Sequence, residues 1–496
     1  FVPYHAVEDS LWTWLSESLV AGTVSSGIYY GYGSVDSVTA PNSFTSSIYL
    51  KSNNGVLLFD KDWPYLEGLN ADIVIQNSEV WIDSKEANIA GTPLNDVVAY
   101  LPKAIPQKAN FIDISAKSQI TRELVSYWLS ESPISNNTKH IAEQLEIKNG
   151  ADVNISLKVP VSQAEGSEKK ESVAYRVNTN IVDGDITHIP SKLHFNDVNG
   201  QVVVDSKTGV TAKSVKAKLF EEAVSLSINT DYRVKKVNKQ THTDQVTKLF
   251  LNGSLSLSST FDYFESAKPD FLNGKLPYLA ELTLFSDEKK YPLLTIDTNL
   301  KGVNCKCPLP FYKEKAQEQD LKVSLLLKPD QSYLEGHLVS SDAPPINAEL
   351  LFVGNQLSFG EFLVGDAQVK NTDIKGINIA ASLESAELGE WIDFLKQALR
   401  TKASNVSTEN MDSSDEKSTL VKQVQIDINK LNAYNYFFQK STLNIKPSSE
   451  SWMIGVEGQD VAGNVLLESS ENVLSLDFDR LNLSQLVTAN NLKSSS

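Results

Sequence analysis

The sequence predicts a mainly β protein whose strands each carry one apolar and one polar face. Two observations support this fold class. Apolar residues alternate with polar ones over most of the chain, and only a few short segments have helical spacing. Because side chains alternate between the two faces of a strand, each such segment places its apolar residues on one side. Many apolar strand faces therefore need a cover.

The first long β region predicted from the sequence runs from Trp63 to Ala90. It opens with a Trp-Pro turn, alternates through 71–76, breaks at the polar residues 76–79 and alternates again. Residues Ala87 to Ala90 give a third pass that ends at Gly91. We expect a meander with one apolar face, whose inward residues are Ile73, Ile75, Val80 and Ile82.

Similar alternation recurs along the rest of the chain, separated by polar connectors. The further strand segments are 153–159, 224–228, 255–257, 323–327, 424–428 and 474–478. The connectors are 163–172, 234–248, 312–320 and the Ser-, Asn- and Asp-rich stretch 403–419. The predicted organisation is an N-terminal β segment with two short helices at 1–162, a middle β segment at 173–402, a flexible loop at 403–419 and a C-terminal β segment at 420–496.

Three segments have apolar residues at helical spacing: Ser10 to Ala21, Thr121 to Ser130, and Glu387 to Thr401. Each carries tryptophan and leucine on one side. We interpret them as short amphipathic helices packed on a sheet. They are too few and too short to cover all the predicted strands.

The composition excludes several classes of protein. Of 496 residues, 41% are hydrophobic and 22% are charged, so the chain can bury a core. Its net charge of −17 repels phosphate polymers, which disfavours a nucleic-acid partner. No apolar run is long enough for a spanning helix, and no signal peptide is visible. Since the chain begins at Phe1, we interpret it as part of a longer protein.

No motif indicates catalysis, a cofactor or a metal. The six histidines are scattered, and the sequence has no HExxH, GxSxG or GxxxxGK[ST] pattern. Cys305 and Cys307 are the two cysteines, and the next soft metal ligand, His337, is far along the chain. We interpret the cysteines as two free thiols and predict that the protein is not an enzyme.

Two kinds of cover would satisfy the apolar strand faces. One is a second sheet, as in a sandwich or solenoid, and the pattern alone favours it. The other is a foreign apolar ligand held in a groove. The residues by themselves leave both open.

An ordered series of motifs follows along the chain. It consists of DSLWTWLSESLVAG at 9–22, GIYYGYG at 27–33, the Trp63-Pro64 pair, ADIVIQNSEVWI at 71–82, SESPI at 130–134, VNISLKVPV at 153–161, LHFNDVNG at 193–200, CPLPFYK at 307–313, WMIGV at 452–456 and VAGNV at 461–465. The series resembles the YhdP family, large AsmA-superfamily proteins of Gram-negative envelopes. Cys307, Phe311 and Tyr312 depart from the Leu, Leu and Gly that the family has at these places.

The resemblance implies a long, twisted antiparallel sheet curled into an open groove, with a few short amphipathic helices. It implies a periplasmic protein, anchored in the inner membrane at full length and similar to eukaryotic bridge-like lipid-transfer proteins. The implied function is to conduct phospholipids between inner and outer membranes and so support the outer-membrane barrier. Its partners would be acyl chains and, through parts outside this chain, the two membranes.

The apolar rows are the predicted lipid-groove lining. They are Ile73, Ile75, Val80, Ile82, Val153, Ile155, Leu157, Val224, Leu226, Ile228, Leu325, Ile426, Leu474 and Leu476. Each of these could instead be an ordinary core position, because periodicity shows only that a face is apolar. The alternative function is a non-enzymatic structural or adhesive β-solenoid or β-sandwich that binds protein or glycan.

Overall fold

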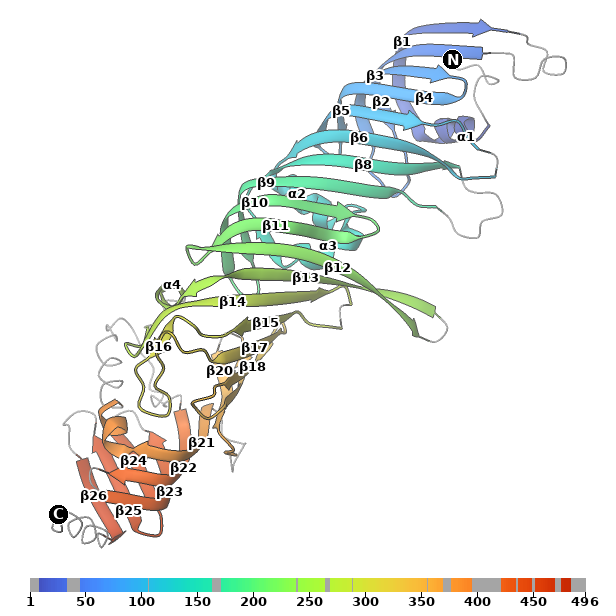
Figure 1. Ribbon diagram of the computed structural model, residues 1–496. Coiled ribbons are helices and arrows are strands. Elements are labelled where there is room, and N and C mark those ends of the chain that lie inside the picture. Colours follow the sequence, from blue (N-terminus) through green and yellow to red (C-terminus); the bar gives the residue numbers. More distant parts are fainter. Residues whose placement is uncertain are drawn as a thin grey trace, which may run out of the picture. The chain divides into compact units, whose positions relative to one another are not determined.

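The computed structural model describes residues 9–33, 45–105, 107–162, 171–237, 240–263, 268–287, 289–354, 356–368, 376–394, 421–433, 436–447, 451–468 and 474–482. The predicted loop 403–419 lies outside them. The strands form one open sheet of 26 strands, with 68% of the residues in strands and 10% in helices. The predicted mainly β fold with an open, antiparallel-dominated sheet is therefore confirmed, and Figure 1 labels its elements.

The helices are α1 (Asp9–Ser18), α2 (Arg122–Ser130), α3 (Ser135–Ala142) and α4 (Leu257–Tyr263), and residues 388–394 are also helical. The strands before residue 260 are β1 (Leu19–Tyr32), β2 (Thr45–Leu57), β3 (Leu66–Gln76), β4 (Glu79–Ile89), β5 (Thr92–Leu101), β6 (Asn110–Ile120), β7 (Leu145–Ile147), β8 (Ala151–Ser162), β9 (Ala174–His188), β10 (Leu193–Asp205), β11 (Gly209–Leu219), β12 (Glu222–Val237) and β13 (Gln240–Ser256).

The later strands are β14 (Leu272–Phe285), β15 (Leu293–Thr298), β16 (Val303–Cys305), β17 (Asp320–Leu327), β18 (Gln331–Val339), β19 (Ile346–Val353), β20 (Gln356–Val364), β21 (Gly376–Glu387), β22 (Val421–Ala433), β23 (Tyr436–Pro447), β24 (Ser451–Glu457), β25 (Val461–Glu468) and β26 (Leu474–Leu481). Neighbouring strands pair antiparallel, except that β20 with β21 and β21 with β22 pair parallel.

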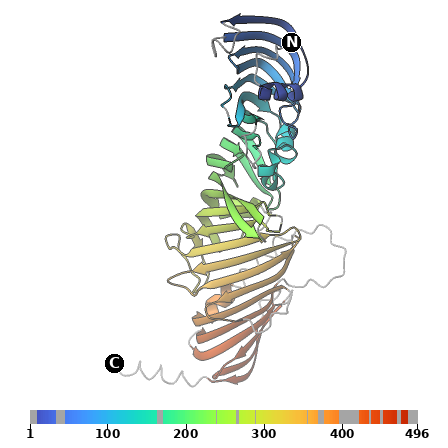
Figure 2. The same ribbon diagram turned by 90° about the vertical axis from the view of Figure 1, so that its right-hand side faces the viewer.

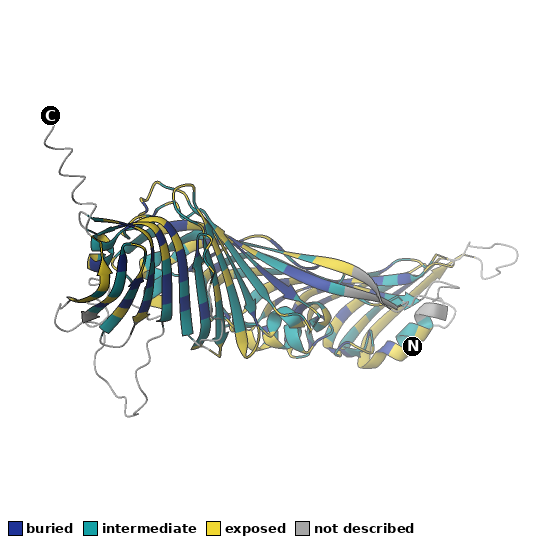
Figure 3. Cartoon of the chain, turned by 90° about the horizontal axis from the view of Figure 1, so that it is seen from below, coloured by how far each residue is buried: buried dark blue, intermediate teal, exposed yellow. Residues whose placement is uncertain are grey.

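The chain divides into two compact units. The first comprises Phe1–Leu219, Ser225–Leu249 and Leu284–Lys290, and the second comprises Phe220–Val224, Phe250–Thr283 and Tyr291–Ser496. Along many strands, buried and exposed residues alternate, as the dark blue and yellow segments of Figure 3 show. In each unit we call the sheet face that carries the buried apolar cluster the inner face, and the opposite face the outer face.

Turn chemistry fixes the register of the first meander. Asn77 and Ser78 both have positive φ, 49° and 68°, which is the backbone of a tight two-residue hairpin. This turn sets Ile75 opposite Val80 on one face. The predicted third pass at 87–90 is wrong, because Ala87 to Ile89 form the second half of β4. Between Ser84 and Ala87 the buried positions of this strand change from even to odd residues.

Several element boundaries differ from the sequence prediction. The first helix is shorter than 10–21, because residues 19–21 pair with β2 as the start of β1. The predicted connector 234–248 is wrong: β12 and β13 extend through most of it. Leu257 begins α4 rather than lying in a strand. Helix α2 agrees with the prediction, and the third predicted helix begins at 388 and is described as far as 394.

Close backbone approach explains the glycine of the VAGNV motif. Gly463 has a φ of +151°, and a Cβ at this position would lie 2.3 Å from the carbonyl oxygen of Asp477 on β26. Only glycine fits a strand where the neighbouring backbone comes so near. By contrast, the nearest atom to a Cβ at Gly455 of β24 would be 3.7 Å away.

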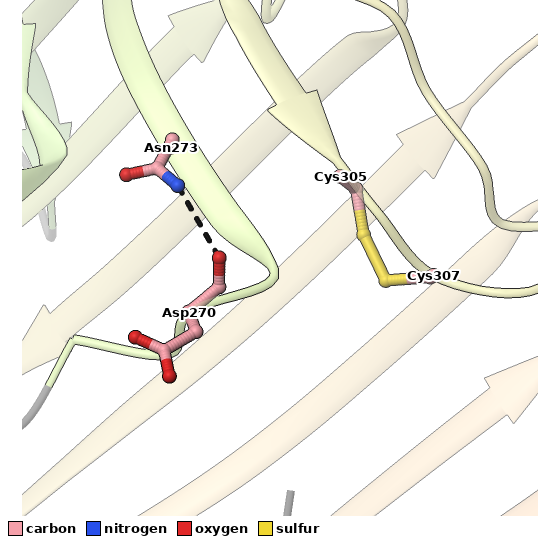
Figure 4. The surroundings of a disulfide bond; sticks show 4 residues. All are labelled: Asp270, Asn273, Cys305 and Cys307. Atoms are coloured by element: carbon pink, nitrogen blue, oxygen red, sulfur yellow. Dashed lines mark hydrogen bonds between the residues drawn. A yellow bond between two sulfur atoms is a disulfide. The ribbon is translucent and has the colours of Figure 1, made fainter. Parts of the chain in front are cut away.

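The two cysteines form a disulfide, so their interpretation as free thiols is wrong. Figure 4 shows the bond at the end of β16, near the turn where the Asn273 side chain donates a hydrogen bond to the Asp270 carbonyl. The CPLPFYK motif in the loop after β16 ends at Lys313, whose side chain is buried at 3% exposure. Its Nζ donates to the carbonyl oxygens of Leu300, Val303, Glu314 and Gln317 at 2.8, 2.9, 3.2 and 2.7 Å, and burial lowers its pKa.

Candidate functional site

Apolar side chains form continuous rows across the inner face of the first unit. Residues directly opposite each other on paired strands share a face, so the register defines each row. One row is Leu50, Ile73, Ile82, Ala99, Ile114, Leu157 and Tyr175. A second is Ile48, Ile75, Val80 and Leu101. A third is Ala116, Ile155, Val177, Val204 and Val210. The rows run perpendicular to the strands and give the unit an apolar floor.

The structure brings the predicted residues of this unit together. Ile73, Ile75, Val80, Ile82, Ile155 and Leu157 all lie in the three rows. Val153 lies one row further, next to Thr179, and is 4% exposed. On β12, Val224 is buried and Ile228 packs against the first unit's core, so by alternation Leu226 shares their side.

The inner face of the second unit has similar rows. One consists of Phe362, Ile379, Val424, Ile445, Ile454, Val465 and Leu476. Ile426 packs against the same buried cluster. Leu476 has the position predicted for it, but its side chain is 57% exposed, because β26 is the last strand and, among the described residues, pairs with β25 alone. The Leu474 side chain lies outside the described residues.

A stretch of this inner face is apolar but not sealed. Leu282, Leu294, Leu325, Leu334 and Leu350 form a row across β14, β15, β17, β18 and β19. From Leu294 onward the side chains are half-buried and lie outside the buried cluster. Within the described part of the second unit, the segment 388–394 packs through Trp391 on the buried cluster of β20–β25. The Trp391 and Phe394 rings also contact Phe311 and Phe271, with ring centroids 5.9 and 5.1 Å apart. The strands of this unit are drawn from yellow to red in Figure 2.

The first unit also encloses an apolar cavity of about 230 Å³. Its floor includes Ile114, Ile155 and Val204, and its roof is formed by side chains of α2 and α3. The roof residues are Val125, Trp128, Leu129, Ile134, Thr138, Ile141 and Ala142. Trp63, from the loop before β3, packs against Trp128 and Tyr175 with ring centroids 6.3 and 6.1 Å apart. Trp63 therefore lines one wall of the cavity. The sheet begins before this residue, at β1.

Three titratable groups on or next to helix α3 carry no charge at neutral pH. Burial lowers the pKa of both His140 and His188 to about 4 and raises the pKa of Tyr175 to about 12. The His140 ring pairs with the Thr247 hydroxyl at 3.2 Å, and the His188 ring pairs with the Ser191 hydroxyl at 2.6 Å. The site can therefore bind apolar matter without a competing buried charge.

The outer face carries charged side chains, beside exposed aromatic ones such as Tyr49 and Trp81. Exposed ion pairs join neighbouring strands there: Lys117 with Asp96 at 3.0 Å, and Lys158 with Asp113 at 3.9 Å. Such pairs add little stability but keep this face soluble. Gln76, Asn154 and Ser225, each next to a predicted groove residue, are exposed. The contrast between the two faces is the main chemical feature of the sheet.

Several residues of the site were not predicted. Leu94, Val97, Ile112 and Ile114 of β5 and β6 belong to the floor. Alternation in the sequence could have revealed Ile112 and Ile114, but Leu94 and Val97 are three residues apart across a register shift, which alternation does not predict. Helix α3 was missed because SNNTKHIA has only two apolar residues and no amphipathic repeat. No sequence signal placed α2 and α3 over the cavity.

In the described ranges, no three His, Cys, Asp or Glu side chains are grouped so that they could hold a metal ion. Among the same residues, none of the helices combines the length and apolarity needed to cross a membrane.

Comparison with known proteins identifies the family. Neither the curated proteins nor the solved structures give a match. The family model described as YhdP protein matches residues 1–496, which is the whole chain and agrees with the order of motifs in the sequence. The chain belongs to the YhdP family, whose members are AsmA-like envelope lipid-transport proteins.

Proposed function

We propose that this chain is the lipid-conducting part of a periplasmic transfer protein, anchored in the inner membrane at full length. It holds phospholipid acyl chains on its apolar inner face and conducts them between inner and outer membranes, which supports the outer-membrane barrier. It needs no catalytic residue and no cofactor. The observation that carries this proposal is the leucine row on β15, β17, β18 and β19, because its side chains are only half-buried and none of them belongs to the buried cluster of the second unit.

Energetics support an apolar floor as a transfer path. A phospholipid carries roughly 30 methylenes, and each costs about 0.8 kcal/mol to expose to water. Passage through an aqueous compartment without help is therefore very slow. A row of leucines and valines continued from strand to strand offsets that cost at each step, while the headgroup stays in water. No deep binding minimum is required.

Site-specific photo-crosslinking tests the proposal. A photoreactive amino acid is placed at Ile155 or at Leu226, which face the apolar side, and the matched controls are Asn154 and Ser225, the preceding residues on the outer face. The protein is incubated with vesicles that contain radiolabelled phosphatidylethanolamine and is then irradiated. We expect lipid adducts at the two inner positions and background at the two controls. Equal labelling of all four positions would remove the groove assignment.

A further inference from the structure

The hairpin of α2 and α3, residues 122–142, crosses the groove of the first unit. The antiparallel strands define two edges of this groove. The first edge carries the turn Asn77–Ser78 and the turn 206–208, and the second edge carries Ala90–Gly91 and the turn 189–192. Strand β6 ends at the second edge and β8 begins there, so the hairpin leaves from and returns to that edge.

Both ends of the hairpin are held at the second edge. Ile120 and Ala151 are paired residues, and a Cβ at Gly150 would lie 2.2 Å from the Ile120 carbonyl oxygen, so the two legs meet closely there. The Trp128 indole nitrogen donates to the Thr92 hydroxyl at 2.7 Å, at the start of β5. These contacts make the second edge a fixed base for the hairpin.

The middle of the hairpin reaches towards the first edge. The Asn137 amide nitrogen donates to the Tyr175 hydroxyl at 2.7 Å, and the Gln245 side chain donates to the Asn137 carbonyl oxygen at 3.2 Å. Tyr175 itself is tied to the first-edge turn, since its backbone exchanges hydrogen bonds with Ser206. These few polar contacts form a latch between the hairpin and the opposite side of the groove.

A second part of the latch lies one helical turn further along α3. The ring nitrogen of His140 pairs with the Thr247 hydroxyl of β13 at 3.2 Å, and Thr247 pairs with the Thr230 hydroxyl of β12 at 3.0 Å. With the hairpin based at one edge and latched at the other, the groove at this point is a closed ring: sheet below, helices above.

A closed ring does not let a phospholipid pass. The apolar lining suits acyl carbon, of which a cavity of about 230 Å³ holds only a part. The charged headgroup would have to enter a cavity that offers it almost no polar partners. A lipid that keeps its headgroup in water can move along the floor only if the latch opens. The latch consists of a few side-chain hydrogen bonds between half-buried residues of the hairpin and buried residues of the sheet, and none of these bonds belongs to a strand ladder. It can therefore open locally while the sheet stays paired.

We propose that residues 122–142 are a gate in the lipid path, based at the second edge and latched at the first by Asn137 and His140. This inference rests on the proposed lipid-transfer function. The closed state holds acyl chains beneath α2 and α3, and the open state lets the headgroup pass.

The first experiment weakens the latch. Asn137→Ala removes the donor to Tyr175, and Asn136→Ala, the exposed neighbour, is the control. Hydrogen exchange should speed up across 122–142 as one unit, while β6 and β8 stay protected. Protein loaded with pyrene-labelled phosphatidylethanolamine should release it to unlabelled vesicles about three- to tenfold faster, as expected from the loss of one hydrogen bond.

The second experiment closes the latch reversibly. Thr247→Cys places a thiol beside His140, so that one sulfur and one nitrogen of the chain can bridge added Zn²⁺ while solvent fills its other positions. The native cysteines cannot compete because they are bonded to each other. Added Zn²⁺ should slow lipid release at least tenfold, and a chelator should restore the rate. Thr247→Ser, treated in the same way, should show no zinc effect.

The outcomes separate the two proposals. If the unaltered protein takes up no labelled lipid, the lipid-transfer function fails and the gate fails with it. If lipid is taken up but release is unchanged by Asn137→Ala and by zinc with Thr247→Cys, the gate alone is overturned. Faster release from the first variant, with zinc-dependent slowing in the second, supports both.

Discussion

The substitution Leu325→Asp should block lipid passage while costing little stability, because Leu325 lies where the inner face is open. Full burial of a leucine side chain contributes about 1.5–3 kcal/mol, so the loss of this half-buried one should cost roughly 1 kcal/mol. The new carboxylate can remain hydrated. In contrast, Ile75 is 4% exposed within the first unit's core, and Ile75→Asp would strand an unpaired charge there, at about 4 kcal/mol or more.

Chemical denaturation of the two variants measures this difference directly. Asn347→Asp is the control for lipid transfer, since it adds the same charge to the outer face of β19, opposite His337. We expect transfer between donor and acceptor vesicles to fall strongly in Leu325→Asp and to stay unchanged in the control. If Leu325→Asp were as destabilising as Ile75→Asp, the leucine row would be part of a sealed core and the reasoning from exposure would be wrong.

Further predictions concern pH and backbone. The pKa values of His140 and His188 fall from 6.5 when unfolded to about 4 when folded, so the unfolded chain binds protons first. Stability should be complete above pH 6.5 and be lost as the pH falls towards 4, by up to about 3 kcal/mol for each histidine. In the double variant His140→Gln/His188→Gln, the free energy of unfolding, measured by denaturation at several pH values, should change less between pH 6.5 and 4. An unchanged pH dependence would refute the assignment of this loss of stability to the two histidines. Gly463→Ala should lower stability by about 1–3 kcal/mol, because the new Cβ would meet the backbone of β26. Gly455→Ala should have little effect, and thermal denaturation of the two variants measures the difference.

Much of the fold could be predicted because period-two alternation is a local signal. Ile73, Ile75, Val80 and Ile82 share a face by spacing alone, and the Asn77 turn fixes which residues pair. Whether an apolar face is open or sealed depends instead on which residues pack against it. Those residues can lie far away in the sequence, so local alternation does not reveal them. The sequence pattern by itself favoured a sandwich or solenoid, and the family resemblance was needed to expect an open sheet.

The roof of the first unit shows where local signals fail. Helix α2 was predicted, but its place over the cavity depends on Trp128 reaching Thr92 and on Asn137 reaching Tyr175, contacts between residues distant in sequence. Similarly, the spacing of Cys305 and Cys307 is compatible with two free thiols or with a disulfide. The structure shows the disulfide, at the end of β16. Leu476 lies on the inner face, as predicted, but its side chain is exposed because β26 is the last strand of the sheet.

The central claim is that the inner face holds phospholipid, and the lipid content of the purified protein tests it most directly. The chain would be expressed in the periplasm, purified without detergent, extracted with organic solvent and analysed by mass spectrometry. We predict phospholipid at least equimolar with the chain, and less of it in Leu325→Asp than in Asn347→Asp. Folded protein that carries no phospholipid, and acquires none from vesicles, would contradict the account.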